Sequence, residues 1–279
     1  MSEAPLQCPC QSAHFRQIHV YDAPPEGEIR FTFASQNYHR ELLHCTLCRH
    51  FISRHHMTPG TLYDGDYVDA TYGGEDGLRR TFERIIALAP GKSDNIGRAT
   101  RIAAFAAAHF GEQKVEDPGS IKLLDVGAGL GVFPHKIKQM GWDCTALDPD
   151  PRAVKHMREV VQVNTVQADF MTAEDLGQYD VITFNKVLEH LPDPVTMLKR
   201  ALKFLKPSGF VYVEIPDGEQ AIKDGTGREE FFIDHLHIFS MASAAMLAER
   251  GGFTVEAMER LQEPSTKYTL CAFLTINQA

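Results

Sequence analysis

Residues 125–131 read Asp125-Val-Gly127-Ala-Gly129-Leu-Gly131 and directly follow the apolar run 121–124. An apolar strand that enters a glycine-rich turn and then a helix is typical of α/β sheets that bind nucleotide-like cofactors. A dinucleotide fingerprint needs a glycine at position 132, where this chain has Val132. Asp125 would also repel a pyrophosphate. The turn therefore favours a cofactor with positive charge and no phosphate, such as S-adenosylmethionine (SAM) with its ammonium and sulfonium groups.

Strand-like and helix-like segments alternate from residue 120 onward, which predicts an α/β, Rossmann-like sheet of seven strands. Strands are expected over residues 121–126, 142–147, 163–168, 179–185, 210–215, 253–261 and 268–276. Helices are expected over residues 130–141, from 151 after the Asp150-Pro151 cap, over 194–205 and over 240–250. The last two strands have no helix between them, so we expect one antiparallel edge strand on a mainly parallel sheet.

The segment before the sheet has a different character. Residues 1–70 are rich in His, Pro, Asp and Tyr and show no sustained helical period, so we expect them to be irregular. Apolar residues recur at helical spacing over 75–110, with a break at 89–93, and residues 111–119 are typical of a linker. The chain is therefore predicted to divide into a domain over 1–72 and a domain over 73–279, the latter with a helical lead-in (73–119) and a cofactor sheet (120–279).

Composition limits the possible partners and compartments. The 279 residues carry a net charge of −9 without a lysine–arginine run, which argues against nucleic acid or an anionic membrane as the main partner. The N-terminus has no basic and apolar signal-peptide pattern, and the apolar stretch 102–110 is too short to span a bilayer. We expect a soluble cytoplasmic protein that acts on a small molecule.

Two further acids extend the pattern of the glycine turn, and with it the sequence resembles the class I SAM-dependent methyltransferases over residues 120–279. Asp148 ends the second predicted strand, and Ala168-Asp169-Phe170 follows the third. A carboxylate at the position of Asp148 can accept both ribose hydroxyls, and the resemblance implies that Asp169 contacts the adenine amino group. The predicted cofactor residues are Asp125, Gly127, Ala128, Gly129, Asp148, Pro149, Asp169, Phe170, Asn185 and Lys186.

The acceptor side is predicted in the segment 231–240, which connects the fifth strand to the next helix and overhangs the strand ends. His235 is the candidate general base, with Asp234 beside it to orient the ring. The alternative is that His235 and His237 only hold the loop to the sheet. His190 is expected to position or support the site, and is with His237 the next candidate for the base; Glu214 and Asp217 are weaker pocket candidates.

Four of the six cysteines gather in the first fifth of the chain. Cys8, Cys10, Cys45 and Cys48 are expected to bind a structural Zn²⁺ ion, since four thiolates satisfy its tetrahedral geometry. The one-residue gap of Cys8-Pro-Cys10 is tighter than usual, so a histidine could replace one thiolate; the candidates are His14, His39, His44 and His50. Reduced cysteines without metal are the alternative. Cys144 and Cys271 are expected to be small buried apolar groups.

A cysteine cluster ahead of a SAM domain is similar to bacterial methyltransferases with a zinc-binding N-terminal segment, including sugar C-methyltransferases that act on nucleotide-linked keto-deoxysugars. Their loop segment Tyr-His-Glu-His-Leu corresponds to residues 232–236, where His235 is retained, Glu is Asp234, and Phe232 and Ile233 replace Tyr and the first His. Those relatives continue into a C-terminal domain, which we expect this chain to lack. The resemblance implies methyl transfer to a small polar acceptor such as a sugar, nucleotide-sugar or glycan precursor. The alternatives are a non-catalytic SAM-binding module that contains zinc, or a nucleotide-dependent oxidoreductase.

Overall fold

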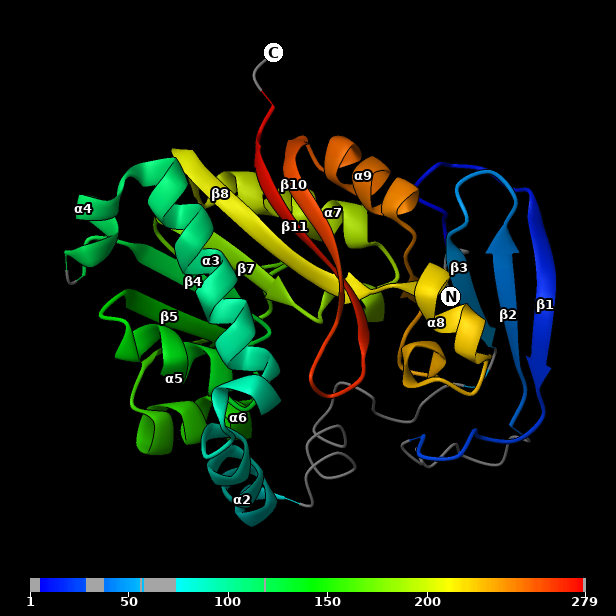
Figure 1. Cartoon of the computed structure of the whole chain (residues 1–279), viewed down its shortest axis with the longest axis horizontal. Coiled ribbons are helices and arrows are strands. Elements are labelled where there is room, and N and C mark those ends of the chain that lie inside the picture. Colours follow the sequence, from blue (N-terminus) through cyan, green and yellow to red (C-terminus); the bar gives the residue numbers. More distant parts are fainter. Residues whose placement is uncertain (1–5, 29–37, 56, 58–73, 118, 278–279) are drawn as a thin grey trace.

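The computed structural model describes residues 6–28, 38–55, 57, 74–117 and 119–277. Two sheets lie next to each other: a large sheet of seven strands, and a small sheet built mostly from the N-terminal strands (Figure 1). The predicted domain boundary between residues 72 and 73 and the N-terminal stretch 1–5 lie outside the described residues.

The large sheet confirms the predicted α/β architecture. Its strand order is β10-β11-β8-β7-β4-β5-β6. The bounds are β4 Lys122–Val126, β5 Asp143–Asp148, β6 Asn164–Gln167, β7 Tyr179–Asn185, β8 Leu205–Pro216, β10 Phe253–Gln262 and β11 Tyr268–Ile276. β4 through β8 pair in parallel, and β11 runs antiparallel to both of its neighbours, β8 and β10. The antiparallel strand is therefore β11, which lies one position inside the sheet, and not the edge strand β10 itself.

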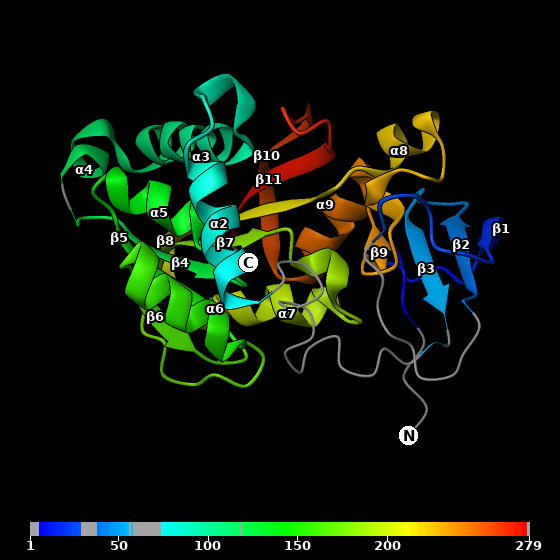
Figure 2. The same cartoon turned by 90° about the horizontal axis from the view of Figure 1, so that it is seen from below.

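Helices cover both faces of the large sheet (Figure 2). The helices are α2 Glu75–Ile86, α3 Asp94–Phe110, α4 Glu112–Glu116, α5 Val132–Gln139, α6 Pro151–His156, α7 Pro194–Arg200, α8 Gly218–Ala221 and α9 Met241–Arg250. Because strand side chains alternate between faces, Leu123 and Val181 pack with α3 and α5, whereas Leu124 and Ile182 pack with α7 and α9. Both helical layers are thus held on the sheet by the burial of apolar surface, which contributes about 25 cal/mol per Å² to the stability of the fold.

The small sheet corrects the expectation that residues 1–70 are irregular. Its antiparallel order is β1-β2-β3-β9, with β1 Phe15–Tyr21, β2 Arg40–Cys45, β3 Phe51–His55 and β9 His237–Ile238. The strands are short, and a register shift interrupts the pairing of β1 with β2 between Gln17 and His19. Since β9 comes from the segment after β8, the small sheet is completed by residues of the C-terminal half.

Several predicted boundaries differ from the structure. The predicted linker 111–119 contains the short helix α4. The helix predicted over 194–205 ends at Arg200 and continues only as a 3₁₀ turn over Ala201–Lys203, because β8 already begins at Leu205. The cap at Asp150-Pro151 is confirmed, since the Asp150 side chain accepts a hydrogen bond from the Arg152 amide. Among the described helices, none has both the length and the apolar character needed to cross a membrane.

Candidate cofactor and acceptor site

The glycine turn leaves the end of β4 and places its middle residue in open space. Gly127 and Gly129 both have positive φ angles, 70° and 50°. A Cβ atom on Gly127 would lie 2.8 Å from Cγ2 of Val187, whereas a Cβ on Gly129 would meet no atom of the described residues within 4 Å. Gly127 is therefore required by packing against the chain beyond β7, and Gly129 is the glycine at which a ligand can approach the backbone.

Asp148 fixes the shape of this turn from the neighbouring strand. Its two carboxylate oxygens accept hydrogen bonds from the amides of Gly129 (2.8 Å) and Asp150 (2.9 Å), and the residue is buried. Burial raises the pKa of the carboxyl in spite of these two bonds. Because each carboxylate oxygen has two lone pairs, the group can still accept hydrogen bonds from a diol. The position fits the predicted ribose contact.

Asp125 lies buried at the end of β4 and is joined to β7 by two hydrogen bonds. Its Oδ1 accepts from the Thr183 hydroxyl (2.6 Å) and from Nδ2 of Asn185 (2.7 Å). Burial raises the pKa of Asp125 to about 7. Oδ1 of Asn185 is buried and has no hydrogen-bond partner among the described residues. A titratable carboxyl and an unpaired acceptor therefore lie next to each other, a combination that suits a ligand with an ammonium group.

The remaining predicted cofactor residues differ in their exposure. Asp169 is exposed, and its side chain accepts a hydrogen bond from the Met171 amide (2.8 Å). Pro149 is exposed beside Asp148, and Ala128 is half-buried in the glycine turn. The ring of Phe170 lies in the core between Phe184 and Phe204, so a contact of this residue with the cofactor would have to use its backbone.

Glu214 is the centre of a buried ion-pair network rather than a pocket residue. Its carboxylate receives two hydrogen bonds from the Arg98 guanidinium (2.5 and 2.7 Å) and one from the Tyr212 hydroxyl (2.9 Å). The Arg98 charge holds the pKa of Glu214 at about 2 against the opposing effect of burial. Nζ of Lys186 lies 3.9 Å from Glu214 and donates to the Thr269 hydroxyl (2.6 Å). Lys186, predicted to touch the cofactor, is thus held at the junction of β7, β8 and β11.

Sequence reasoning missed Arg98, although a signal was present. Arg98 shares a buried helix face with Ile102 and Ala106, at the spacing of successive helical turns. A charged residue within such an apolar stripe needs a buried partner of opposite charge. The partner is Glu214, which fastens α3 to β8.

The predicted acceptor residues come together after β7. His190 and His235 have ring centroids 5.0 Å apart, and Nδ1 of His190 bonds to the Asp234 carbonyl oxygen (2.8 Å). Nδ1 of His235 bonds to the Glu230 carbonyl oxygen (2.9 Å). The carboxylate of Asp234 lies 3.8 Å from His190 Nδ1, and the neighbouring histidines lower its pKa. The sequence therefore predicted a real cluster, in which Asp234 faces His190.

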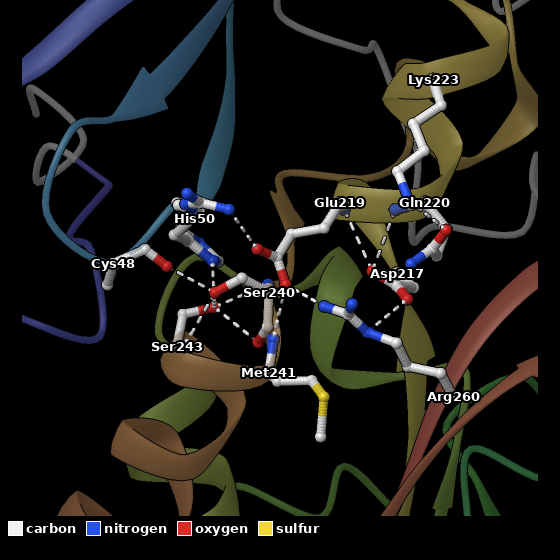
Figure 3. A network of polar contacts seen from close by, with 11 residues as sticks. Cys48, His50, Asp217, Glu219, Gln220, Lys223, Ser240, Met241, Ser243 and Arg260 are labelled. Carbon is white, nitrogen blue, oxygen red and sulfur yellow. Dashed lines mark hydrogen bonds and ion pairs between the residues drawn. The ribbon is translucent and has the colours of Figure 1, made fainter.

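His237 and Asp217 are parts of the framework. His237 is fully buried; Nδ1 bonds to Nε2 of His50 (2.9 Å), Nε2 lies 3.3 Å from the Pro192 carbonyl oxygen, and burial lowers its pKa to about 4. With both ring nitrogens engaged, His237 is not available as a base. Asp217 accepts hydrogen bonds from the amides of Glu219 and Gln220 in α8 and pairs with Arg260 at 3.1 Å (Figure 3).

The four N-terminal cysteines form one cluster. Their sulfur atoms lie within 4.8 Å of one another, with 3.2 Å between Cys8 and Cys48 and 3.6 Å between Cys10 and Cys45. A tetrahedral zinc ion with Zn–S bonds of about 2.3 Å separates its sulfur ligands by about 3.8 Å. The hydrogen bond from Cys8 lowers the pKa of Cys48 to about 5, so a thiolate forms readily here.

The histidines considered as substitutes for a thiolate are not part of this cluster. His50 bonds to His237 and to the Ser243 hydroxyl, and His39 pairs with Asp22. His44 packs against Phe51. All four sulfur ligands are therefore available without help from His14, His39, His44 or His50.

A mainly parallel seven-stranded sheet, a glycine turn after β4 and acids at the ends of β4 and β5 define the class I methyltransferase fold, the class that uses SAM. Residues 94–258, more than half of the chain, match a family described as a methyltransferase domain, and the chain belongs to this family. Of the known proteins, the ubiquinone biosynthesis O-methyltransferase of Xanthomonas axonopodis pv. citri (strain 306) is 32% identical over 104 residues, which cover 35% of this chain and 44% of the relative. The protein of the same name from Bordetella avium (strain 197N) is 32% identical over 98 residues, covering 33% and 41%. The match thus spans less than half the length of these relatives.

Solved structures share the fold at low sequence identity. The 1,6-didemethyltoxoflavin-N1-methyltransferase of Burkholderia thailandensis, solved with S-adenosylhomocysteine (SAH), is 20% identical with a TM-score of 0.56, covering 92% of this chain and 100% of that chain. The magnesium protoporphyrin IX methyltransferase of Synechocystis PCC 6803, also solved with SAH, is 15% identical with a TM-score of 0.57, covering 76% and 97%. At this identity the likeness concerns the fold.

Proposed function

We propose that the chain binds SAM at the ends of β4, β5 and β7 and transfers its methyl group to a small polar acceptor. The observation that carries the proposal is the buried pair of Asp125 and Asn185, in which an unpaired acceptor oxygen lies beside a carboxyl with a raised pKa. An ammonium group satisfies both. The methyltransferase family match supports this function over a nucleotide-dependent oxidoreductase.

The residues present fit SAM in further respects. Asp148 would hold the ribose hydroxyls, and the open space at Gly129 admits the cofactor to the backbone. Asp169, exposed after β6, would reach the adenine amino group. When bound, SAM supplies an activated methyl group on a sulfonium, so the protein has only to position the acceptor and accept or release its proton.

The proton is proposed to leave the acceptor at the cluster after β7. His235 is half-buried, and its Nδ1 is oriented by the Glu230 carbonyl, which leaves Nε2 as the basic nitrogen of the neutral ring. Asp234 orients the neighbouring His190. His235 is therefore proposed as the base, His190 as a positioning residue, and Asp234 as the acid that stabilises positive charge on these rings.

The acceptor atom is proposed to be a hydroxyl oxygen. The curated relatives that match the sequence are O-methyltransferases, which favours oxygen over carbon. A sugar-linked acceptor is the finer hypothesis, and it depends on the resemblance of residues 232–236 to the sugar C-methyltransferase loop. An assay with phenolic and sugar-linked hydroxyl acceptors distinguishes the two classes.

The cysteine cluster is proposed to hold one structural Zn²⁺ ion, with Cys8, Cys10, Cys45 and Cys48 as its ligands. The sulfur separations are close to those of a tetrahedral site. Four ligands leave no open position for chemistry, so zinc would fix the N-terminal segment. The division of the chain into a zinc-binding domain over 1–72 and a methyltransferase domain over 73–279 is part of the same proposal.

Two experiments test the function. Mass spectrometry of the purified protein should detect bound SAM or SAH, and calorimetry should give a micromolar affinity for SAH. Binding of NAD instead of SAH would contradict the proposal. A protein that binds SAH but methylates no acceptor of either class would support the non-catalytic SAM-binding module.

The role of His235 is tested by His235→Ala. The variant should keep its SAH affinity and lose turnover by about a hundredfold or more. Nearly full turnover in the variant would remove His235 from this role, and loss of SAH binding would make the residue structural.

A further inference from the structure

Glu189 is a buried carboxylate that accepts no hydrogen bond from the described residues, and Lys186 is a cation that interacts with it electrostatically. The residue is fully buried, and neither side-chain oxygen has a hydrogen-bond partner among the described residues. An ionised carboxylate in this state is costly unless it is paired or binds a metal ion. The role of Glu189 is not explained by the packing of the 3₁₀ turn Leu188–His190 on which it lies.

Two histidines converge on this carboxylate. Glu189, His190 and His235 each offer a ligand atom, and these three atoms lie within 4.8 Å of one another. Two hydrogen bonds bring the segments together: the Leu236 amide donates to the Glu189 carbonyl oxygen (2.8 Å), and the His190 side chain bonds through Nδ1 to the Asp234 carbonyl oxygen (2.8 Å). Residues 44 and 47 positions apart in the sequence are thus joined by one side-chain bond and one main-chain bond.

Both rings are held by the kind of second hydrogen bond that is common among metal-binding histidines. Nδ1 of His190 and Nδ1 of His235 each bond to a backbone carbonyl oxygen, at 2.8 and 2.9 Å. A carbonyl can only accept, so each Nδ1 carries the proton and the lone pair is on Nε2. Ligating histidines commonly donate their second ring N–H in this way, which fixes the tautomer and the ring orientation.

We propose that Glu189, His190 and His235 form a second metal site, distinct from the cysteine cluster, that binds one divalent cation. Two imidazole nitrogens and one carboxylate suit first-row ions such as Zn²⁺, Fe²⁺, Co²⁺ or Mn²⁺, whereas the thiolate cluster selects zinc. Three protein ligands leave at least one coordination position open. Since both histidines are half-buried, that position can be reached by a small oxygen ligand.

The chemical role of this cation rests on the proposed methyl transfer, although its binding does not. A hydroxyl acceptor bound to the cation would have a lowered pKa and lose its proton to water. The resulting oxygen would attack the methyl carbon, forming the O–C bond while the C–S bond breaks and its electron pair goes to sulfur, which gives the methyl ether and SAH. The two roles of His235 are therefore alternatives: in the metal-free protein it is the base proposed above, and with the cation bound it is a ligand while water takes the proton of the acceptor.

The experiment uses Co²⁺ as the probe on the full chain. Accessible ions are first removed with a chelator, and the metal that remains is measured by elemental analysis. Co²⁺ is then titrated by calorimetry and visible absorption. We expect one Co²⁺ equivalent with nitrogen–oxygen ligand bands and without sulfur-to-metal charge transfer. Glu189→Gln and His235→Gln should each weaken this binding by at least tenfold.

Two controls keep the result interpretable. Without added metal, Glu189→Gln should melt at the same or a higher temperature than the unmodified protein, because it replaces a buried carboxylate that accepts no hydrogen bond from the described residues by an uncharged group of the same shape. His109→Gln, an exposed histidine bound to the Ser208 carbonyl, should bind Co²⁺ normally. The proposal is overturned if only thiolate-bound Co²⁺ appears, or if Glu189→Gln titrates like the unmodified protein. SAH calorimetry on the same samples tests the proposed function separately, since either binding can fail without the other.

Discussion

Replacing Asp125 by asparagine should make the protein more stable and at the same time change how its cofactor affinity depends on pH. Asp125 is buried and accepts hydrogen bonds at Oδ1 from Thr183 and Asn185. An asparagine oxygen can accept the same two bonds, so Asp125→Asn removes the ionisable group with little change in packing. The substitution should have opposite effects on stability and on binding. The cofactor-free protein should become more stable because it no longer contains a buried charge, whereas the cofactor should bind more weakly because its ammonium group loses a counter-ion.

The magnitude follows from the pKa. Burial raises the pKa of Asp125 from its ordinary 3.8 to about 7. This difference corresponds to a contribution of at most about 4 kcal/mol to the unfolding free energy, made by the protonated carboxyl. Because the folded state holds the proton more tightly than the unfolded state, this stability is fully present below pH 3.8 and is lost as the pH rises through 7. Asp125→Asn should therefore match the unmodified protein near pH 4 and exceed its unfolding free energy by up to about 4 kcal/mol at pH 8.

Cofactor affinity should follow the ionised fraction of Asp125. If SAH binds the ionised form through its ammonium group, its affinity rises about tenfold between pH 6 and pH 8 for a pKa of about 7. Asp125→Asn should bind more weakly at pH 8 and show no such rise. Urea unfolding and calorimetry at both pH values measure the two effects, with the exposed Asp175→Asn as the matched control. A variant no more stable than the unmodified protein at pH 8, or one that keeps the rise in affinity, would refute the reasoning.

Three further predictions concern the other parts of the site. Asp148→Ala should weaken SAH binding by about 1–3 kcal/mol in calorimetry, through loss of charge-assisted hydrogen bonds, and unchanged affinity would remove it from the ribose site. Elemental analysis should find about one zinc per chain in the cysteine cluster. The double variant Cys45→Ser, Cys48→Ser should release this zinc while SAH still binds. A metal-free protein with an unchanged melting profile would contradict the zinc site. Arg98→Met should cost about 3–5 kcal/mol in urea unfolding at pH 7, because the buried Glu214 carboxylate loses its two hydrogen bonds from Arg98 and keeps only the Tyr212 hydroxyl and the more distant Arg101 and Lys186. The addition of Glu214→Gln should restore most of the loss, and a cost below about 1 kcal/mol would show that the pair is not needed.

The large sheet could be predicted from the sequence because its signals are local. The apolar runs of β4 and β7, the glycine turn at 127–131 and the Asp150-Pro151 cap each depend on neighbouring residues, and each lies close to its predicted place. The acids Asp125 and Asp148 could be placed for the same reason, since parallel strands end at one edge of the sheet. What the sequence did not indicate is that Phe170 faces the core, because strand-end residues can turn to either side.

The small sheet could not be predicted in this way. Its three N-terminal strands have five to seven residues, and the pairing of two of them contains a register shift. The fourth strand is the two-residue β9 from the far half of the chain. Short strands that carry polar residues on both faces give no clear alternation of apolar and polar positions. Their stability comes from contacts that are distant in sequence, such as the buried ion pair of Arg40 with Glu28.

Contacts of this kind also connect the N-terminal unit, which comprises the cysteine cluster and strands β1 to β3, to the proposed acceptor site. Arg40 donates to the Phe231 carbonyl oxygen (2.5 Å), and Glu28 accepts from the Ile233 amide (2.7 Å), so a buried ion pair of the N-terminal segment holds the chain directly before Asp234 and His235. On the other side of these residues, the Ser240 hydroxyl that caps α9 donates to the carbonyl of Cys48 (2.5 Å; Figure 3). The segment 231–240 is thus fixed at both ends by the N-terminal unit. Because a misplacement of about 0.5–1 Å matters in placing a reacting group, we propose that the cysteine cluster and the small sheet support the segment 231–240 as the acceptor loop.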